Sequence, residues 1–108
     1  MLKGKEKMDK KVNEKQKVEI GDVFKLLSNP IRLNILLLLE DCPQNVNEIV
    51  SKIEGVSQPQ ISRQLSILRN ANVVNYEKQG KKSVYSLEDP DIICIIDSSI
   101  ERIMKMDV

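Results

Sequence analysis

The chain has 108 residues, a net charge of +1 and only 3% aromatic residues, which predicts one domain with a modest core of Ile, Leu and Val. Its two cysteines exclude a disulfide scaffold. No apolar run exceeds five residues, as in Ile35–Leu39 and Ile92–Ile96, whereas a membrane-spanning helix needs about 20. No signal peptide is evident either, so we expect a cytoplasmic protein.

The N-terminal part is expected to divide into an arm and two helices. Residues 1–17 hold seven Lys and little apolar content, which predicts a disordered or frayed arm before a single domain over residues 18–108. An amphipathic helix is expected to begin near Val18 and to break at Ser28-Asn29-Pro30. The following helix, Ile31–Glu40, is apolar almost all round, and we expect it to be buried.

The middle of the chain predicts two helices joined by a tight turn. The first covers about Asn45–Lys52, and the turn is Glu54-Gly55-Val56, where Gly55 can adopt positive φ. Ser57 and Gln60 have the spacing of a reciprocal capping box, which predicts the start of the next helix. This helix should end around 69–72.

The C-terminal part predicts a hairpin and a last helix. Two strands, Val73–Lys78 and Lys82–Leu87, are joined through Gln79-Gly80-Lys81, and a helix starts at Asp89-Pro90. Its apolar stripe consists of Ile92, Ile93, Ile96, Ile100, Ile103 and Met104. The predicted fold is mainly α, a winged helix-turn-helix of order α-α-α-α-β-β-α. The first and last helices are expected to join two copies in a homodimer, although packing within one copy is the alternative.

The helix that starts at Ser57 carries the strongest functional signal. In a helix-turn-helix the N-terminal part of the second helix faces DNA base edges. Gln can bridge adenine and Arg can bridge guanine in the major groove, and Ser can reach phosphates. The candidate contact residues on this helix are Ser57, Gln58, Gln60, Ser62, Arg63 and Gln64.

The predicted hairpin adds a second basic element. Lys78, Lys81 and Lys82 lie near its tip and suit phosphate contacts. Residues 56–82 carry a net charge of +4, as do residues 1–17, while the remainder carries −7. A nearly neutral chain can thus present a positive face to double-stranded DNA. Solvated surface charge and protection of a strand edge are the alternative interpretations.

Four segments together resemble the ArsR/SmtB-type winged helix-turn-helix repressors. They are Leu26–Leu36, Val56–Leu68, Gly80–Leu87 and the apolar last helix. The resemblance implies a homodimer joined by its first and last helices. It also implies that operator DNA is released when an inducer, often a metal ion, binds.

The sequence departs from that family in its recognition helix and at its metal-ligand positions. Gln64 stands where many members have His in the recognition helix, so the base preference is expected to differ, and the stretch that matches a Cys-x-Cys metal pair is Asn45-Val46-Asn47. The nearest match to the zinc-type site on the last helix is Asp89, Asp91, Arg102 and Lys105. Because two cations would repel a metal, we expect neither metal site to be intact, and we expect no cofactor.

Cys42 and Cys94 leave a further alternative. Together they could form a thiol-based redox switch if their sulfurs can meet, but we prefer Cys94 as a small core residue between Ile93 and Ile95. The sequence predicts a homodimeric repressor of an inverted-repeat operator, with an inducer that it does not identify. A winged helix that serves only as a protein-interaction module is the alternative from another class. With no His and no phosphate-binding loop, an enzyme is not expected.

Overall fold

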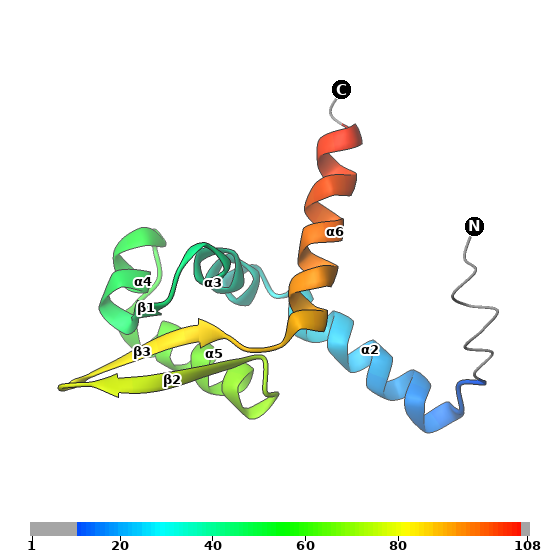
Figure 1. Cartoon of the computed structure of the whole chain (residues 1–108), viewed down its shortest axis with the longest axis horizontal. Coiled ribbons are helices and arrows are strands. Elements are labelled where there is room, and N and C mark those ends of the chain that lie inside the picture. The colour runs from blue at the N-terminus through cyan, green and yellow to red at the C-terminus, as the bar shows by residue number, and fades with distance from the viewer. Residues whose placement is uncertain (1–10, 107–108) are drawn as a thin grey trace.

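The computed structural model describes residues 11–106 and confirms the mainly helical fold with a small antiparallel sheet (Figure 1). Helices α2 and α6 extend away from a body that the other elements form (Figure 1). In chain order the elements are α2 (Glu14–Ser28), α3 (Pro30–Asp41), β1 (Gln44–Asn45), α4 (Val46–Lys52), α5 (Gln58–Asn70), β2 (Val74–Gln79), β3 (Lys82–Leu87) and α6 (Pro90–Met106).

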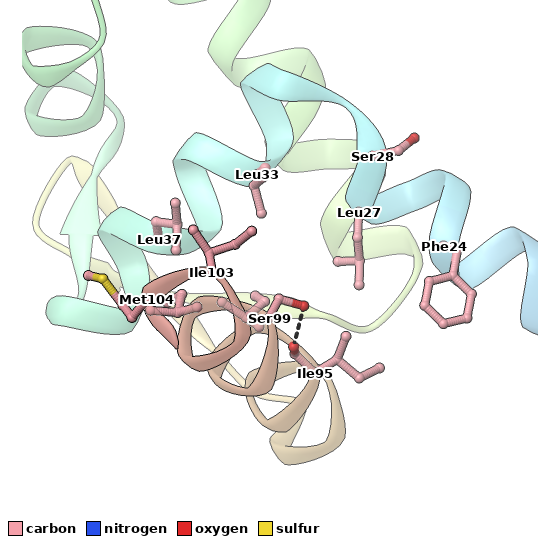
Figure 2. A pocket seen from close by; sticks show the side chains of 11 residues that line it. Phe24, Leu27, Ser28, Leu33, Leu37, Ile95, Ser99, Ile103 and Met104 are labelled. Atoms are coloured by element: carbon pink, nitrogen blue, oxygen red, sulfur yellow. Dashed lines mark hydrogen bonds between the residues drawn. The ribbon is translucent and has the colours of Figure 1, made fainter. Parts of the chain in front are cut away.

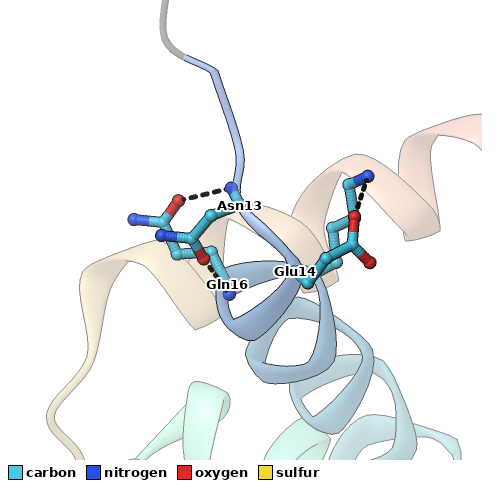
Figure 3. Close-up of polar contacts among 4 residues, drawn as sticks. Asn13, Glu14 and Gln16 are labelled. Atoms are coloured by element: carbon cyan, nitrogen blue, oxygen red, sulfur yellow. Dashed lines mark hydrogen bonds and ion pairs between the residues drawn. The ribbon is translucent and has the colours of Figure 1, made fainter.

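Helix α2 begins four residues before the predicted start at Val18. The Asn13 side chain accepts a hydrogen bond from the Gln16 backbone N–H at 2.7 Å, and the Gln16 side chain accepts from the Asn13 N–H at 3.0 Å (Figure 3). This reciprocal cap satisfies amides that a helix start leaves free. The predicted arm over residues 1–17 is therefore helical from Glu14 onward, and residues 1–10 lie outside the described residues.

Helix α3 is buried on one side only, so the prediction that this helix is buried holds for only part of its surface. Ile35, Leu36 and Leu39 are buried, whereas Leu33 and Leu37 remain 37% and 40% exposed. The outer side of the helix is not covered because α2 and α6 diverge beside it (Figure 1). The exposed leucines therefore belong to an open apolar surface.

A third strand was missed by the sequence analysis. Strand β1 pairs with β3 in the order β1-β3-β2, and it consists of only two residues, Gln44 and Asn45. Gln44 is 2% exposed, and its Nε2 donates to the Leu38 carbonyl at 2.8 Å while its Oε1 accepts from Lys52 Nζ at 2.9 Å. The strand thus closes the C-terminus of α3, and Asn45 caps α4 instead of starting it.

The core is entirely aliphatic, as predicted from the composition. It connects α3, α4 and α5 to the sheet and to the first turns of α6, and α2 contributes no buried residue. The buried hydrophobic residues are Ile35, Leu36, Leu39, Ile49, Ile53, Ile61, Leu65, Leu68, Val73, Val74, Ile92 and Ile96.

Helix α5 ends in a left-handed residue that turns the chain into the hairpin. Asn72 has φ 62°, and the amides of Asn72 and Val73 donate to the carbonyls of Arg69 and Leu68 at 2.9 and 3.0 Å. This is the Schellman arrangement, with Asn where Gly is commoner. It places Val73 and Val74 directly in the core beside the helix that they follow.

The hairpin forms where it was predicted, but both ends of its first strand lie one residue later than expected. Strand β2 starts at Val74 instead of Val73, and Gln79 pairs with Lys82, which leaves Gly80 and Lys81 as a two-residue turn. Gly80 has φ +67°, a conformation that other residues adopt at a steric cost. The tip of the hairpin therefore carries Lys81 and Lys82, both exposed, at the end farthest from the core.

Candidate DNA interface

Helices α4 and α5 form a helix-turn-helix unit. Ile49 of α4 and Ile61 of α5 are both fully buried, and the turn between the helices contains Gly55 with φ +75°, as predicted. This geometry leaves the opposite side of α5 without cover from the rest of the described chain. That open side is where such a unit contacts DNA.

The start of α5 is fixed by the predicted capping box. The Ser57 backbone N–H donates to Gln60 Oε1 at 2.8 Å, and the Gln60 N–H donates to Ser57 Oγ at 3.3 Å. Pro59 lies in the first turn, where a missing N–H has no cost. Both side chains are exposed but already engaged, so the Gln60 amide keeps only its NH2 group free for a further partner.

The remaining candidates on α5 divide between an exposed face and an edge. Gln58, Ser62 and Arg63 are exposed: Gln58 is the first residue of the helix, and Arg63 lies opposite the buried stripe of Ile61, Leu65 and Leu68. Gln64 differs because it is half-buried, and its Oε1 accepts a hydrogen bond from Arg32 Nη1 of α3 at 3.1 Å. The structure therefore separates Gln64 from the other predicted contact residues.

The β2–β3 hairpin presents lysines next to this helix. Lys78, Lys81 and Lys82 are exposed, and no carboxylate within residues 11–106 forms an ion pair with them. The hairpin follows α5 directly through the Asn72 turn, so both elements extend from the same body (Figure 1). Unpaired ammonium groups on a projecting hairpin can bind phosphates.

An aromatic stack joins the hairpin to α5, and sequence analysis missed it. The Arg69 guanidinium lies 4.6 Å from the Tyr76 ring centroid, and the Tyr76 ring lies 5.2 Å from that of Tyr85. Tyr76 and Tyr85 pair directly across β2 and β3, which was the available signal. Arg69 contributes to the net charge of +4 over residues 56–82. Its contact with Tyr76 holds the β2–β3 hairpin against the C-terminal end of α5.

The two cysteines do not lie in the core. Both Cys42 and Cys94 are exposed and free, so the preferred interpretation of Cys94 as a core residue is wrong. Its neighbours two positions away, Ile92 and Ile96, face the core. Since a helix turns about 100° per residue, the residue midway between them points outward.

Two of the positions that match the family's ligand sites, Asn45 and Asp89, have structural roles here. The Asn45 side chain caps α4, and the Asp89 carboxylate accepts from the amides of Asp91 and Ile92 at the start of α6. Within the described residues no group of three or more His, Cys, Asp or Glu side chains is arranged to hold a metal ion. In the same part of the chain, no helix is long and apolar enough to cross a lipid bilayer.

The helix-turn-helix and its hairpin define a winged helix-turn-helix regulator. Residues 29–76 match the model of the bacterial regulatory proteins of the arsR family. The crystal structure of Rv0081 from Mycobacterium tuberculosis superposes with a TM-score of 0.77 and 30% sequence identity, covering 87% of this chain and 93% of that one. The chain belongs to the ArsR family of transcriptional regulators.

Sequence relatives and a second structure agree with this assignment. The HTH-type transcriptional regulator Rv0081 is 38% identical over 72 residues, which cover 67% of this chain and 63% of the length of that relative. NmtR of Mycobacterium tuberculosis is 28% identical over 92% of this chain and 82% of its own length. The transcriptional repressor BigR of Xylella fastidiosa superposes with a TM-score of 0.70 at 29% identity, over 79% of this chain and 86% of that one.

The aromatic stack can be tested through the titration of Tyr85. Burial, followed by the neighbouring Tyr76, raises the pKa of Tyr85 above its usual range, and the positive charge of Arg69 opposes this rise. Because a cation favours the phenolate, Arg69→Gln should raise the pKa of Tyr85 further. Tyrosinate absorbance in a pH titration would measure it, since the chain has only two tyrosines. Arg63→Gln is the control, and equal shifts in both variants would contradict the stack.

Proposed function

We propose that this chain is a homodimeric transcriptional repressor that binds double-stranded operator DNA. Helix α5 enters the major groove, and the β2–β3 hairpin lies along the adjacent phosphate backbone. The observation that carries the proposal is the division of α5 into two faces. Ile61, Leu65 and Leu68 are fully buried, whereas Ser62 and Arg63 are exposed, as is Gln58 at the start of the helix; the hairpin that follows carries exposed lysines at its tip.

The exposed side chains suit distinct parts of DNA. The Arg63 guanidinium can donate two hydrogen bonds to guanine O6 and N7, and the Gln58 amide can pair with adenine N6 and N7. Gln60 retains an NH2 donor for a base or phosphate. The proposed phosphate contacts come from Ser57, Ser62, Lys78, Lys81 and Lys82, which would fix the position of α5 in the groove.

An apolar groove between α2, α3 and α6 supports the homodimer. Its volume is about 580 Å³, and side chains from all three helices line it (Figure 2). Phe24 is 58% exposed, Ile103 54% and Met104 64%, which is unusual for large apolar side chains that share one surface. The hydroxyls of Ser28 and Ser99 already donate to the carbonyls of Lys25 and Ile95, so the groove offers little to a polar ligand.

A second copy of the chain is the occupant that fits this groove. Each copy offers the same two projecting apolar helices, so a two-fold axis can bury the groove of one copy against α2 or α6 of the other. The two α5 helices would then enter successive major grooves about 34–36 Å apart. The operator should accordingly be an imperfect inverted repeat.

Two substitutions separate base recognition from phosphate binding. Arg63→Ala should relax the base preference at one position of each half-site and weaken binding there by about 1–3 kcal/mol. Lys81→Ala should weaken binding to all sequences alike and reduce the salt slope by about one. Fluorescence anisotropy over a salt series, with an operator selected from a random duplex library, would measure both.

Lys105→Ala is the control for lost charge, because Lys105 lies on α6 and pairs with Glu101 at 4.0 Å. It should leave the salt slope unchanged. Wild-type protein that selects no sequence and shows no salt-sensitive binding would contradict the proposal. That outcome would favour the alternative of a protein-interaction module.

The dimer can be tested with a charge placed in the groove. Ile103→Glu should produce a monomer, because burying an unpaired carboxylate in an apolar interface costs several kcal/mol or more. Sedimentation velocity would measure the change in mass, and the fold should persist because Ile103 is exposed in the single chain. Ser51→Glu is the control for the added charge, since Ser51 is exposed on α4 and lies outside α2, α6 and the groove. A monomeric wild type would refute the dimer.

Thiol sensing is a second candidate because Cys42 and Cys94 are both exposed and free. Oxidation by peroxide can join two thiols in a disulfide, with both thiol hydrogens leaving in water. In this case peroxide should lower the operator affinity of the wild type but not of Cys42→Ser or Cys94→Ser. Peptide mass spectrometry would identify the linkage. Unchanged DNA binding in oxidised wild type, without a Cys42–Cys94 peptide, would exclude this function.

A further inference from the structure

Arg32 joins three helices through one guanidinium group. Its Nε donates to the Leu26 carbonyl of α2 at 3.0 Å, and its Nη1 donates to Gln64 Oε1 of α5 at 3.1 Å. Its own backbone amide is held by the Asn29 side chain, which caps α3 at 3.0 Å. Arg32 is half-buried, so these bonds are partly shielded from water.

The contact of Arg32 with α2 gives the Leu26 carbonyl a hydrogen-bond donor that the helix itself cannot provide. Leu26 lies in the last turn of α2, where backbone carbonyls have no partner further along the helix. The positive charge of a guanidinium at this end also interacts favourably with the negative end of the helix dipole. Arg32 thus fixes how α2 leaves the body, and α2 forms one wall of the apolar groove through Phe24 and Leu27.

The contact with α5 fixes the orientation of the DNA-facing helix. Gln64 follows Ile61 by three residues and precedes Leu65, so it lies at the edge of the buried stripe. The Gln64 oxygen is held by Arg32, and a bidentate contact with adenine needs both the oxygen and the NH2 of one amide. Presenting both groups to a base would require the bond to Arg32 to break.

We propose that Arg32 and Gln64 are a positioning pair that sets the orientation of α5 relative to α2. This inference rests on the proposed function, in which α2 belongs to the dimer interface and α5 to the DNA interface. In the dimer the pair would determine the separation and relative rotation of the two α5 helices. Arg32 and Gln64 therefore select the spacing between operator half-sites, whereas Arg63 selects a base.

The chemistry of arginine explains why this residue type suits the position. The planar guanidinium holds two donors in a fixed relation, so one side chain can couple two helices. A lysine has a single ammonium group on a flexible stem and cannot hold both acceptors in the same geometry. Arg32→Lys therefore keeps the charge and removes the coupling.

The experiment compares spacing preference with base preference. Wild type, Arg32→Lys, Gln64→Ala and the double variant are each measured by anisotropy on the selected operator, on a single half-site, and on operators with one base pair added or removed between half-sites. One base pair moves the half-sites by about 3.4 Å along the axis. Arg63→Ala is the matched control, because Arg63 directly precedes Gln64 on α5. Circular dichroism confirms that each variant is folded.

The expected result is a loss of spacing preference without a change in the preferred bases. Wild type should discriminate against altered spacing by about tenfold, within the usual range of coupling between sites. Arg32→Lys and Gln64→Ala should each reduce this discrimination severalfold and bind the single half-site like wild type. The double variant should resemble either single one, since the two residues act as a unit. Arg63→Ala should keep the spacing preference and lose base preference.

Two outcomes would overturn the positioning role. Folded variants that keep the wild-type spacing preference would show that the pair only stabilises the fold. A Gln64→Ala variant that loses preference at one base position, while Arg32→Lys does not, would make Gln64 a base-contacting residue. Wild type that selects no DNA at all would instead refute the proposed function, so the two failures are distinguishable.

Discussion

The packing of α5 against the rest of the body is the contact on which the other features of this protein depend. Ile61, Leu65 and Leu68 are fully buried, whereas the opposite side of the helix carries exposed polar residues such as Arg63. Burying such side chains stabilises a domain by about 1.5–3 kcal/mol each, which fixes the rotation of the helix about its axis. The exposed face is therefore a consequence of the buried one. The capping box of Ser57 and Gln60 fixes the residue at which α5, and therefore its exposed face, begins.

A second constraint is that one copy of the chain has more apolar surface than its own core can cover. The buried residues lie in the body, whereas α2 contributes none and the second half of α6 is exposed throughout. Helices with little tertiary packing are marginal in water. A cap at Asn13 and a bond to the Leu26 carbonyl stabilise the two ends of α2, but neither covers its apolar side. In the proposed homodimer, a second copy of the chain would provide the missing packing.

Local patterns predicted much of this structure, and contacts between distant residues account for what was missed. The caps at Ser57 and Asp89 depend on neighbours within three residues, so sequence spacing revealed the starts of α5 and α6. The Arg32–Gln64 bond spans 32 positions and leaves no periodic signal. Strand β1 is too short to show alternation, and it exists because β3 offers an edge. The Lys-rich composition obscured the cap at Asn13, so the predicted start of α2 at Val18 was four residues too late.

Basic side chains have two separate roles in the proposed complex of DNA with this chain, whose net charge is only +1. Two arginines make contacts within the protein: the half-buried Arg32 links helices, and the exposed Arg69 lies over the Tyr76 ring. Arg63 and the hairpin lysines, by contrast, form no ion pair within residues 11–106. Because their partners are neutral groups, Arg32 and Arg69 keep their positive charge and still add to the potential of the protein. In the proposed complex, affinity should depend on salt through the hairpin and on sequence through Arg63, while Arg32 and Arg69 determine where both are placed.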